Sequence, residues 1–140
     1  MQENLGYYLT RGIPAALAGA LSYLFGPWDA PIAILLCVVC LDYITGVINA
    51  AIHKTVSSAV GFSGLLKKVL IFVLVALAAL LDKLVPATNG AVRTAVCMFY
   101  IANEGLSILE NAGSMGLPLP RALKSALEKL KKEEEPKASS

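Results

Sequence analysis

Polar side chains lie inside a stretch that is apolar enough for lipid, LLCVVCLDYITGVINAAIHK, from Leu35 to Lys54. Together with one glycine they recur at i, i+3, i+4, i+7 and i+11 and so fall on one side of a helix: Asp42, Thr45, Gly46, Asn49 and His53. A charge at the centre of a bilayer costs roughly 2.5 to 3.5 kcal/mol on insertion scales, so such residues usually face a bundle interior or water. We therefore expect the carboxylate of Asp42 to contact other helices or water and not lipid.

A second polar stripe is predicted in the apolar segment at about 91–109 and just beyond it. Its members fall on or near one helix face: Arg93, Cys97, Tyr100, Asn103, Glu104, Ser107, Glu110 and Asn111. Val92, Phe99 and Leu106 are among the apolar residues on the opposite side. Both segments thus have one polar and one apolar side.

Two interpretations of these stripes differ in whether the stripes ever meet water. In the first, Asp42 and Glu104 pair with Arg93, or bond to Asn and Ser side chains, inside a static bundle. In the second, the stripes form a surface that can become wet, because they carry more polar groups than short helices need for cohesion. We favour the second for the stripes as a whole, and the predicted pore-lining residues are Asp42, Thr45, Asn49, Arg93, Tyr100, Asn103, Glu104, Ser107, Glu110 and Asn111.

The sequence does not predict an enzyme or a cofactor site. His53 is the single histidine, no Gly-rich phosphate loop is present, and no nucleophile is placed with a base and an orienting group. Cys37 and Cys40 form a CxxC without a second Cys or His pair at a usable spacing, so we expect no metal site.

The composition is that of a membrane protein. Of the 140 residues 56% are hydrophobic and 16% are charged, and the mean hydropathy is +0.66. The net charge is +2, and six of the twelve Lys and Arg residues lie after Asn111, so the basic character belongs mostly to the C-terminal tail. No nucleic-acid-binding face is implied.

We therefore expect an all-α integral membrane protein with a transmembrane domain at 1–111 and three or four transmembrane helices. The apolar segments lie at about 12–25, 30–52, 69–85 and 91–109. The second is long enough to cross the hydrocarbon, since about 22 residues at 1.5 Å each reach roughly 33 Å. The first is short and contains Pro14, so an interfacial or re-entrant helix is its alternative. The segment from His53 to Gly64 is predicted to be a polar loop.

Basic residues predict the orientation. Lys54, Lys67 and Lys68 follow the second segment and six more basic residues lie in the C-terminal region, so both regions should be cytoplasmic. Four spans with both termini inside satisfy this rule, and so do three spans with an outside N-terminus and a surface-lying first segment.

The region 112–140 is predicted to be a cytoplasmic amphipathic helix and a charged tail. Its apolar residues recur at helical spacing: Leu119, Leu123, Ala126, Leu127 and Leu130. This helix could lie on the bilayer surface, pack on a partner, or remain solvated and run into a disordered tail from Glu133.

Small residues that allow close helix packing form a further pattern. They lie at four-residue steps in the first segment. The predicted packing positions are Gly12, Ala16, Gly19 and Ala20 in that segment and Gly46 in the second.

Three stretches carry a resemblance to a known family: LDYITG (Leu41 to Gly46), GFSGLLKK (Gly61 to Lys68) and YIANEGLSILENAGSMGLPLP (Tyr100 to Pro120). In these stretches the chain resembles the toxin-secretion and phage-lysis holins, small membrane proteins, from about Pro31 to Leu130. The matching positions are Asp42, Tyr43, Thr45, Gly46, Lys67, Lys68, Asn103, Glu104, Ser107, Glu110 and Asn111.

The resemblance implies a phage protein that accumulates in the cytoplasmic membrane of its bacterial host and forms homo-oligomers. The oligomers would open lesions through which an endolysin reaches the cell wall, while some relatives serve the release of a toxin. The polar stripes would then be hidden against other helices in the resting assembly and turned toward water on opening. Two other functions stay open: a small cation channel or transport subunit with Asp42 and Glu104 as ion ligands, and a membrane anchor for a soluble partner.

Overall fold

The computed structural model describes residues 2–134, and within this range the chain is helical with no strand, which confirms the predicted all-α class. The elements are α1 (Gln2–Tyr7), the π-helical turn η1 (Tyr8–Gly12), α2 (Ile13–Phe25), α3 (Ala30–Ile52), α4 (Ser58–Leu84), the 3-10 turn η2 (Pro86–Thr88), α5 (Ala91–Ser114) and α6 (Arg121–Glu134).

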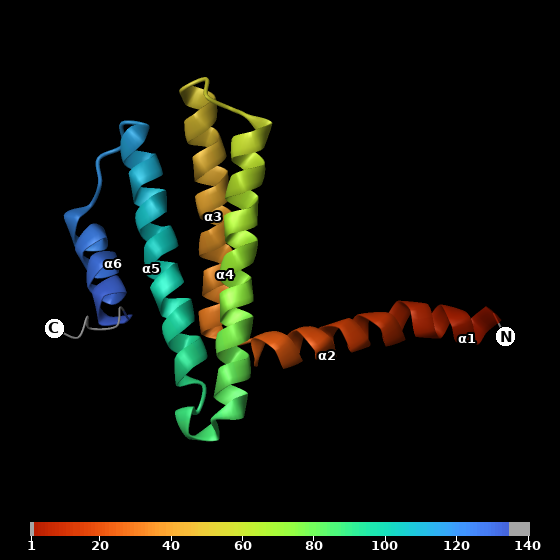
Figure 1. Ribbon diagram of the computed structural model, residues 1–140. Helices are drawn as coiled ribbons and strands as arrows, with labels where there is room; N and C mark the ends of the chain where they lie inside the picture. The colour runs from red at the N-terminus through yellow and green to blue at the C-terminus, as the bar shows by residue number, and fades with distance from the viewer. Residues whose placement is uncertain (1, 135–140) are drawn as a thin grey trace.

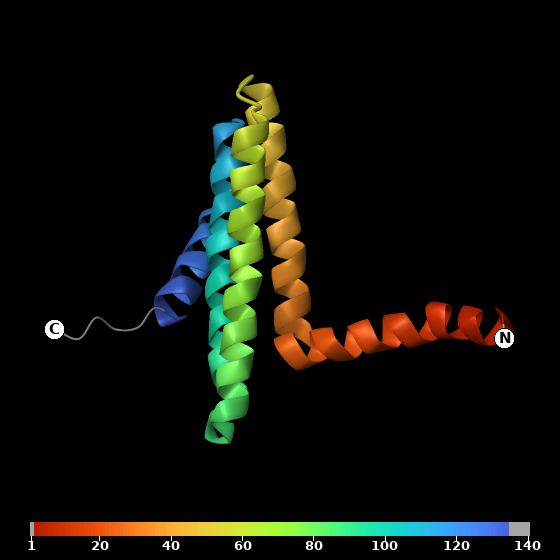
Figure 2. The same ribbon diagram turned by 45° about the vertical axis from the view of Figure 1, so that its right-hand side comes forward.

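Three long helices, α3, α4 and α5, form a bundle in which the chain runs up, down and up again (Figure 1). Helix α5 packs against both α3 and α4, and α6 folds back along the outer side of α5. The first helices form an arm that leaves the bundle at the start of α3 and runs across the bundle axis in both views (Figures 1 and 2).

The core of the bundle is a column of apolar residues at helical spacing. It consists of Ile32, Leu35 and Val39 of α3, Ile71 and Val75 of α4, and Cys97 of α5. Leu35, Val75 and Cys97 are completely buried. The outward sides of α3 and α4 are apolar as well, with Leu41, Leu70 and Val73 each more than half exposed. An apolar outer surface is expected on helices that lipid surrounds.

The loop predicted from His53 to Gly64 is too long. Helix α4 begins at Ser58, well before the apolar segment predicted at 69–85, and the connection from α3 is short. Hydropathy places Ser58 to Lys68 outside the apolar segment, although Val60, Phe62 and Leu65 fit a helix and no proline interrupts it. Helix α5 also runs past the predicted segment, to Ser114. Lys68 is consequently a helical residue.

Among residues 2–134, two helices are long and apolar enough to cross a membrane, α3 and α4. Helix α2 has 13 residues, and the polar residues of α5 lower its hydropathy. The count of three or four spans therefore stays a prediction.

Candidate functional site

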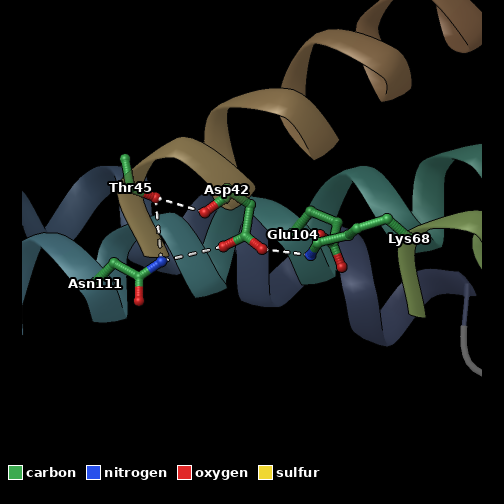
Figure 3. A network of polar contacts seen from close by, with 5 residues as sticks. All are labelled: Asp42, Thr45, Lys68, Glu104 and Asn111. Atoms are coloured by element: carbon green, nitrogen blue, oxygen red, sulfur yellow. Dashed lines mark hydrogen bonds and ion pairs between the residues drawn. The ribbon is translucent and has the colours of Figure 1, made fainter. Parts of the chain in front are cut away.

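Charged residues from three helices meet inside the bundle. Lys68 Nζ of α4 donates to Asp42 Oδ2 of α3 and to Glu104 Oε2 of α5 (Figure 3). Asp42 is 6% exposed and Glu104 is 4% exposed. We call Asp42, Lys68 and Glu104 the charged cluster.

The cluster continues the apolar core in helical register. On α3, Asp42 follows Leu35 and Val39 at steps of seven and three residues, so it points the same way. On α4, Lys68 precedes Ile71 and Val75 in the same manner. The side of each helix that faces the bundle is therefore apolar toward one end and charged near the middle.

Amide and hydroxyl groups extend the cluster along the α3–α5 interface. Asn111 Nδ2 donates to Asp42 Oδ1 at 3.3 Å and to Thr45 Oγ1 at 3.1 Å (Figure 3). Thr45 Oγ1 donates to the carbonyl oxygen of Asp42 at 3.0 Å. One turn farther, Ser114 Oγ donates to Asn49 Oδ1 at 3.0 Å. Polar contacts thus run from the middle of α3 toward its C-terminal end.

Gly46 lies at the close approach of these two helices. A Cβ at this position would be 3.7 Å from Asn111 Nδ2, which is ordinary van der Waals contact. A larger side chain would compete with the amide that reaches Asp42 and Thr45.

The charges of the cluster do not balance. It has two carboxylates and one ammonium group, and among the described residues no buried side-chain nitrogen or oxygen lacks a hydrogen-bond partner. Buried charges are tolerated when they are paired, and loss of one partner leaves the other uncompensated. The stability of this interface therefore depends on Lys68 more than on either acid.

Arg93 is not the partner of these acids, so the predicted pairing of Asp42 or Glu104 with Arg93 is wrong. Arg93 lies near the opposite end of α5, where Nη1 and Nη2 each bind an oxygen of Asp29 at 2.8 Å. Nη2 also donates to the carbonyl oxygen of Pro27 at 2.8 Å, and Nε donates to that of Phe25. Asp29 lies just before α3, and the hydrogen bonds from Arg93 lower the pKa of its carboxyl group. Arg93 thus fixes the turn between the arm and the bundle.

The other predicted stripe residues are dispersed. Tyr100 packs on the apolar core, Asn103 and Ser107 are half-buried, and Glu110 is exposed. His53 Nδ1 lies 2.9 Å from the carbonyl oxygen of Asn49 in its own helix. The structure therefore gathers Asp42, Thr45, Asn49, Glu104 and Asn111 and leaves the remaining candidates outside the network. Their role in a pore stays a prediction.

The predicted packing residues of the arm are exposed. Gly12, Ala16, Gly19 and Ala20 all lie on the open arm, and no atom of another residue lies within 4 Å of a Cβ built at Gly19. Contacts between copies through these residues stay a prediction.

Two residues of the network were not among the predicted pore-lining residues, although Lys68 is one of the positions that carry the resemblance to the holins. Ser114 lies beyond the predicted end of the last apolar segment, and Lys68 lies before the start of the third. The signal for Lys68 is its spacing of three and seven residues to Ile71 and Val75.

The sequence of the chain is similar to those of a known family and of several bacterial proteins. A family model described as the bacteriophage holin family matches residues 19–132. An uncharacterized protein of Halalkalibacterium halodurans is 44% identical over 130 residues, which cover 90% of this chain and 96% of that protein. An uncharacterized protein of Clostridium perfringens is 42% identical over 128 residues, 91% of this chain and 96% of its own length.

A phage protein is also similar. A probable holin of Bacillus phage phi105 is 37% identical over 108 residues, which cover 77% of this chain and 78% of the phage protein. No solved structure matches the chain. The family match and the phage relative confirm the resemblance predicted from the three sequence stretches.

Proposed function

Because the chain belongs to the bacteriophage holin family, we propose that it self-associates in the cytoplasmic membrane of a bacterial host and opens lesions for an endolysin. Family membership and the apolar helices α3 and α4 make it a membrane protein. The phage relative is a probable holin, which supports a role in host lysis rather than in catalysis.

The observation that carries this proposal is the charged cluster at the middle of apolar helices. Asp42 lies close to the centre of α3, which spans Ala30–Ile52. Each charge at such a depth costs roughly 2.5 to 3.5 kcal/mol when it faces hydrocarbon. Three helices hide these charges by pairing them with each other. Water in a lesion would solvate the same groups, so their charges can be compensated by each other in a closed arrangement and by water in an open one.

The arrangement of the helices supports three spans. We place α3, α4 and α5 across the bilayer, with Lys54 and the C-terminal region in the cytoplasm, because basic residues favour that side. Helix α2 has 13 residues, so it reaches about 20 Å and is shorter than the roughly 30 Å of hydrocarbon. We therefore place the arm along the outer surface, with α6 as the amphipathic cytoplasmic helix.

The test is controlled expression in bacteria with and without an endolysin. We expect abrupt lysis when the endolysin is present, and release of a folded cytoplasmic enzyme of endolysin size into the periplasm when it is absent. Graded ion leakage without enzyme release would instead identify a narrow channel. Accumulation in the membrane without leakage or release would identify an anchor, and either result would refute the proposal.

A further inference from the structure

A groove lies between α3 and α4 at the end where the short connection joins them (Figure 1). Its volume is about 250 Å³, and small residues leave this space: Gly46 and Ala50 of α3, and Gly61 and Gly64 of α4. A Cβ placed at Gly64 would meet no other residue within 4 Å, so α3 does not fill this side of α4. The lining residues come from α3, α4 and their connection, and we call the space the α3–α4 groove.

Two polar side chains of the groove are free to bind a ligand. Lys67 is exposed, and within residues 2–134 its Nζ forms no ion pair and Tyr43 Oη forms no hydrogen bond. Tyr43 reaches from α3 toward α4, since its Oη lies 3.7 Å from a Cβ placed at Gly61. An ammonium group and a phenol hydroxyl both donate hydrogen bonds. The pair is therefore suited to an acceptor with several oxygens.

The charge of the groove selects an anion. Among the residues that line it Asp42 is the one acid, and this carboxylate is bonded to Lys68. The sequence from Lys54 to Lys68 has three lysines and no acidic residue. The uncompensated charge in the groove is therefore that of Lys67, and hydrogen bonds from an ammonium group to an oxyanion are among the strong ones.

The depth of Lys67 indicates where the anion lies. Asp82 marks the other end of α4, where its Oδ2 accepts from the backbone N–H of Arg93 at 2.8 Å. Lys67 precedes Asp82 by 15 residues, which is about 23 Å along the helix. With the outer edge of the roughly 30 Å hydrocarbon layer at Asp82, Lys67 lies about 7 Å from the cytoplasmic edge. The long stem of a lysine brings its ammonium group toward this edge, where phospholipid phosphates lie.

We propose that the α3–α4 groove binds the headgroup of an anionic phospholipid from the cytoplasmic leaflet, whose phosphate accepts from Lys67 Nζ and Tyr43 Oη. This inference rests on the proposed function, which puts the connection after α3 in the cytoplasm. Basic pockets between membrane helices on that side suit such headgroups. Thr55 and Ser57 line the same groove and offer hydroxyl groups to a glycerol headgroup.

The size and the walls of the groove favour a lipid over a soluble ligand. Sites that enclose a small molecule usually have about 300 to 1,000 Å³, so this groove takes up a part of a larger molecule. Val47 and Val60 of its wall are 45% and 67% exposed, which makes the groove continuous with the apolar surface that lipid covers. The headgroup therefore occupies the groove while the acyl chains stay in the bilayer.

A lipid in this position connects two helices that have few direct contacts. Helix α5 packs on both α3 and α4, whereas α3 and α4 contact each other much less. Tyr43 belongs to α3 and Lys67 to α4, so a single phosphate bridges them. The bound lipid therefore stabilises the closed bundle.

The first test follows thermal unfolding of the full chain in micelles of a nonionic detergent with added lipid. We expect phosphatidylglycerol to raise the Tm of the parent, whereas phosphatidylcholine and inorganic phosphate leave it unchanged. Lys67→Met should need at least about tenfold more phosphatidylglycerol for the same shift, because the ammonium group is lost. Lys129→Met removes an exposed lysine of α6 and should behave like the parent. Without phospholipid, Lys67→Met should unfold at the Tm of the parent.

The second test blocks the groove and leaves Lys67 in place. Gly64→Leu fills the groove, whereas Gly19→Leu puts the same side chain on the open arm, and a Cβ at either position meets no other residue within 4 Å. We expect Gly64→Leu to abolish the shift with phosphatidylglycerol and Gly19→Leu to retain it. Tyr43→Phe removes the hydroxyl group alone and should weaken binding roughly threefold.

Several results would overturn the inference: an equal shift with phosphatidylcholine or inorganic phosphate, an equal loss in Lys129→Met, or a full shift in Gly64→Leu. Binding in micelles does not depend on lesions. The expected shifts without enzyme release on expression would therefore refute the proposed function alone. Enzyme release by the parent without a shift on addition of phosphatidylglycerol would refute the lipid site alone.

Discussion

Lys68 supplies the basic group of the charged cluster, and its side chain is 15% exposed. We expect Lys68→Met to lower the free energy of unfolding by on the order of 3 kcal/mol, because Asp42 and Glu104 then remain buried without a counter-charge. Thermal unfolding in detergent micelles, followed by circular dichroism, measures the change. Lys67→Met is the matched control, since Lys67 is the adjacent residue and is exposed. Equal effects of the two substitutions would contradict the role given to Lys68.

Asp42 has a different expected effect, since its loss leaves Lys68 and Glu104 as a balanced pair. We expect Asp42→Leu to accumulate in the membrane at least as well as the parent and to delay lysis, because leucine gains nothing from a water-lined surface. Asn49→Leu should act in the same direction but less, having no full charge to lose. Leu36→Ile is the control, as Leu36 is 39% exposed to the outside of α3. Lysis of Asp42→Leu with the timing of the parent would exclude a wettable cluster.

Helical periodicity predicts the acidic half of this site, whereas Lys68 is singled out only by the resemblance to the holins, for a physical reason. Asp42 and Glu104 lie within long apolar stretches, where helical periodicity alone assigns them to a face. Lys68 directly precedes the apolar run that begins at Val69, so hydropathy leaves it outside the predicted segment. Its register becomes meaningful only once α4 is known to begin at Ser58. The partner of Arg93 could not be predicted, since Asp29 is 64 residues away and is positioned by a turn.

At the level of elements, the arm and the bundle are joined by the contacts of Arg93. The guanidinium group binds Asp29 and two carbonyl oxygens of the intervening turn. Gly26 in this turn has a φ of 77°, and a Cβ there would lie 3.1 Å from Arg93 Nε. Arg93 of α5, which needs glycine beside it, therefore helps to set the direction of the arm. Lys83 of α4 adds a second contact, since its Nζ donates to the carbonyl oxygen of Tyr23 in α2 and lies 3.7 Å from the centroid of the Tyr23 ring.

We expect Arg93→Met to release the arm from its fixed direction. Spin labels at Thr10→Cys and Ala87→Cys, with the native cysteines replaced, report the distance between arm and bundle. The distance distribution should broaden in Arg93→Met and stay narrow in Arg11→Met, because Arg11 lies on the exposed arm itself. An unchanged distribution in Arg93→Met would show that the other contacts, those of Lys83 with Tyr23 and of Phe72 with Phe25, are enough to orient the arm.

The same labels test the ion pair by pH. Arg93 lowers the pKa of Asp29 from its usual 3.8, so the stabilisation is complete above that pH and is lost as the pH falls through the lowered pKa. We expect a narrow distribution from neutral pH down to 3.8 and broadening only below it. Broadening that begins near the pKa of histidine would assign the effect to another group.

At the scale of the whole molecule, the apolar outer surface and the crossing arm set how the chain lies in a bilayer. Helices α3 and α4 expose leucine and valine on their outer sides, and the arm runs across their direction (Figures 1 and 2). The sequence predicts the apolar segments but leaves three and four spans open, since a short segment with a proline fits a surface helix and a re-entrant one alike. The direction of the arm depends on the turn at Gly26 and on the contact of this turn with Arg93. Hydropathy does not predict such a contact.

The orientation can be tested by labelling single cysteines with an impermeant reagent in intact cells, with Cys37, Cys40 and Cys97 replaced. Three spans with a surface-lying arm place Thr10 outside and Ser57 inside, because the basic residues after α3 favour the cytoplasm. Both residues are exposed in the structure, so burial within the chain does not block the reagent. We therefore expect labelling of Thr10→Cys before lysis and of Ser57→Cys only after the cells are opened. Protection of both cysteines would indicate four spans, since the N-terminus would then lie in the cytoplasm, and labelling of Ser57→Cys alone would indicate the inverted orientation.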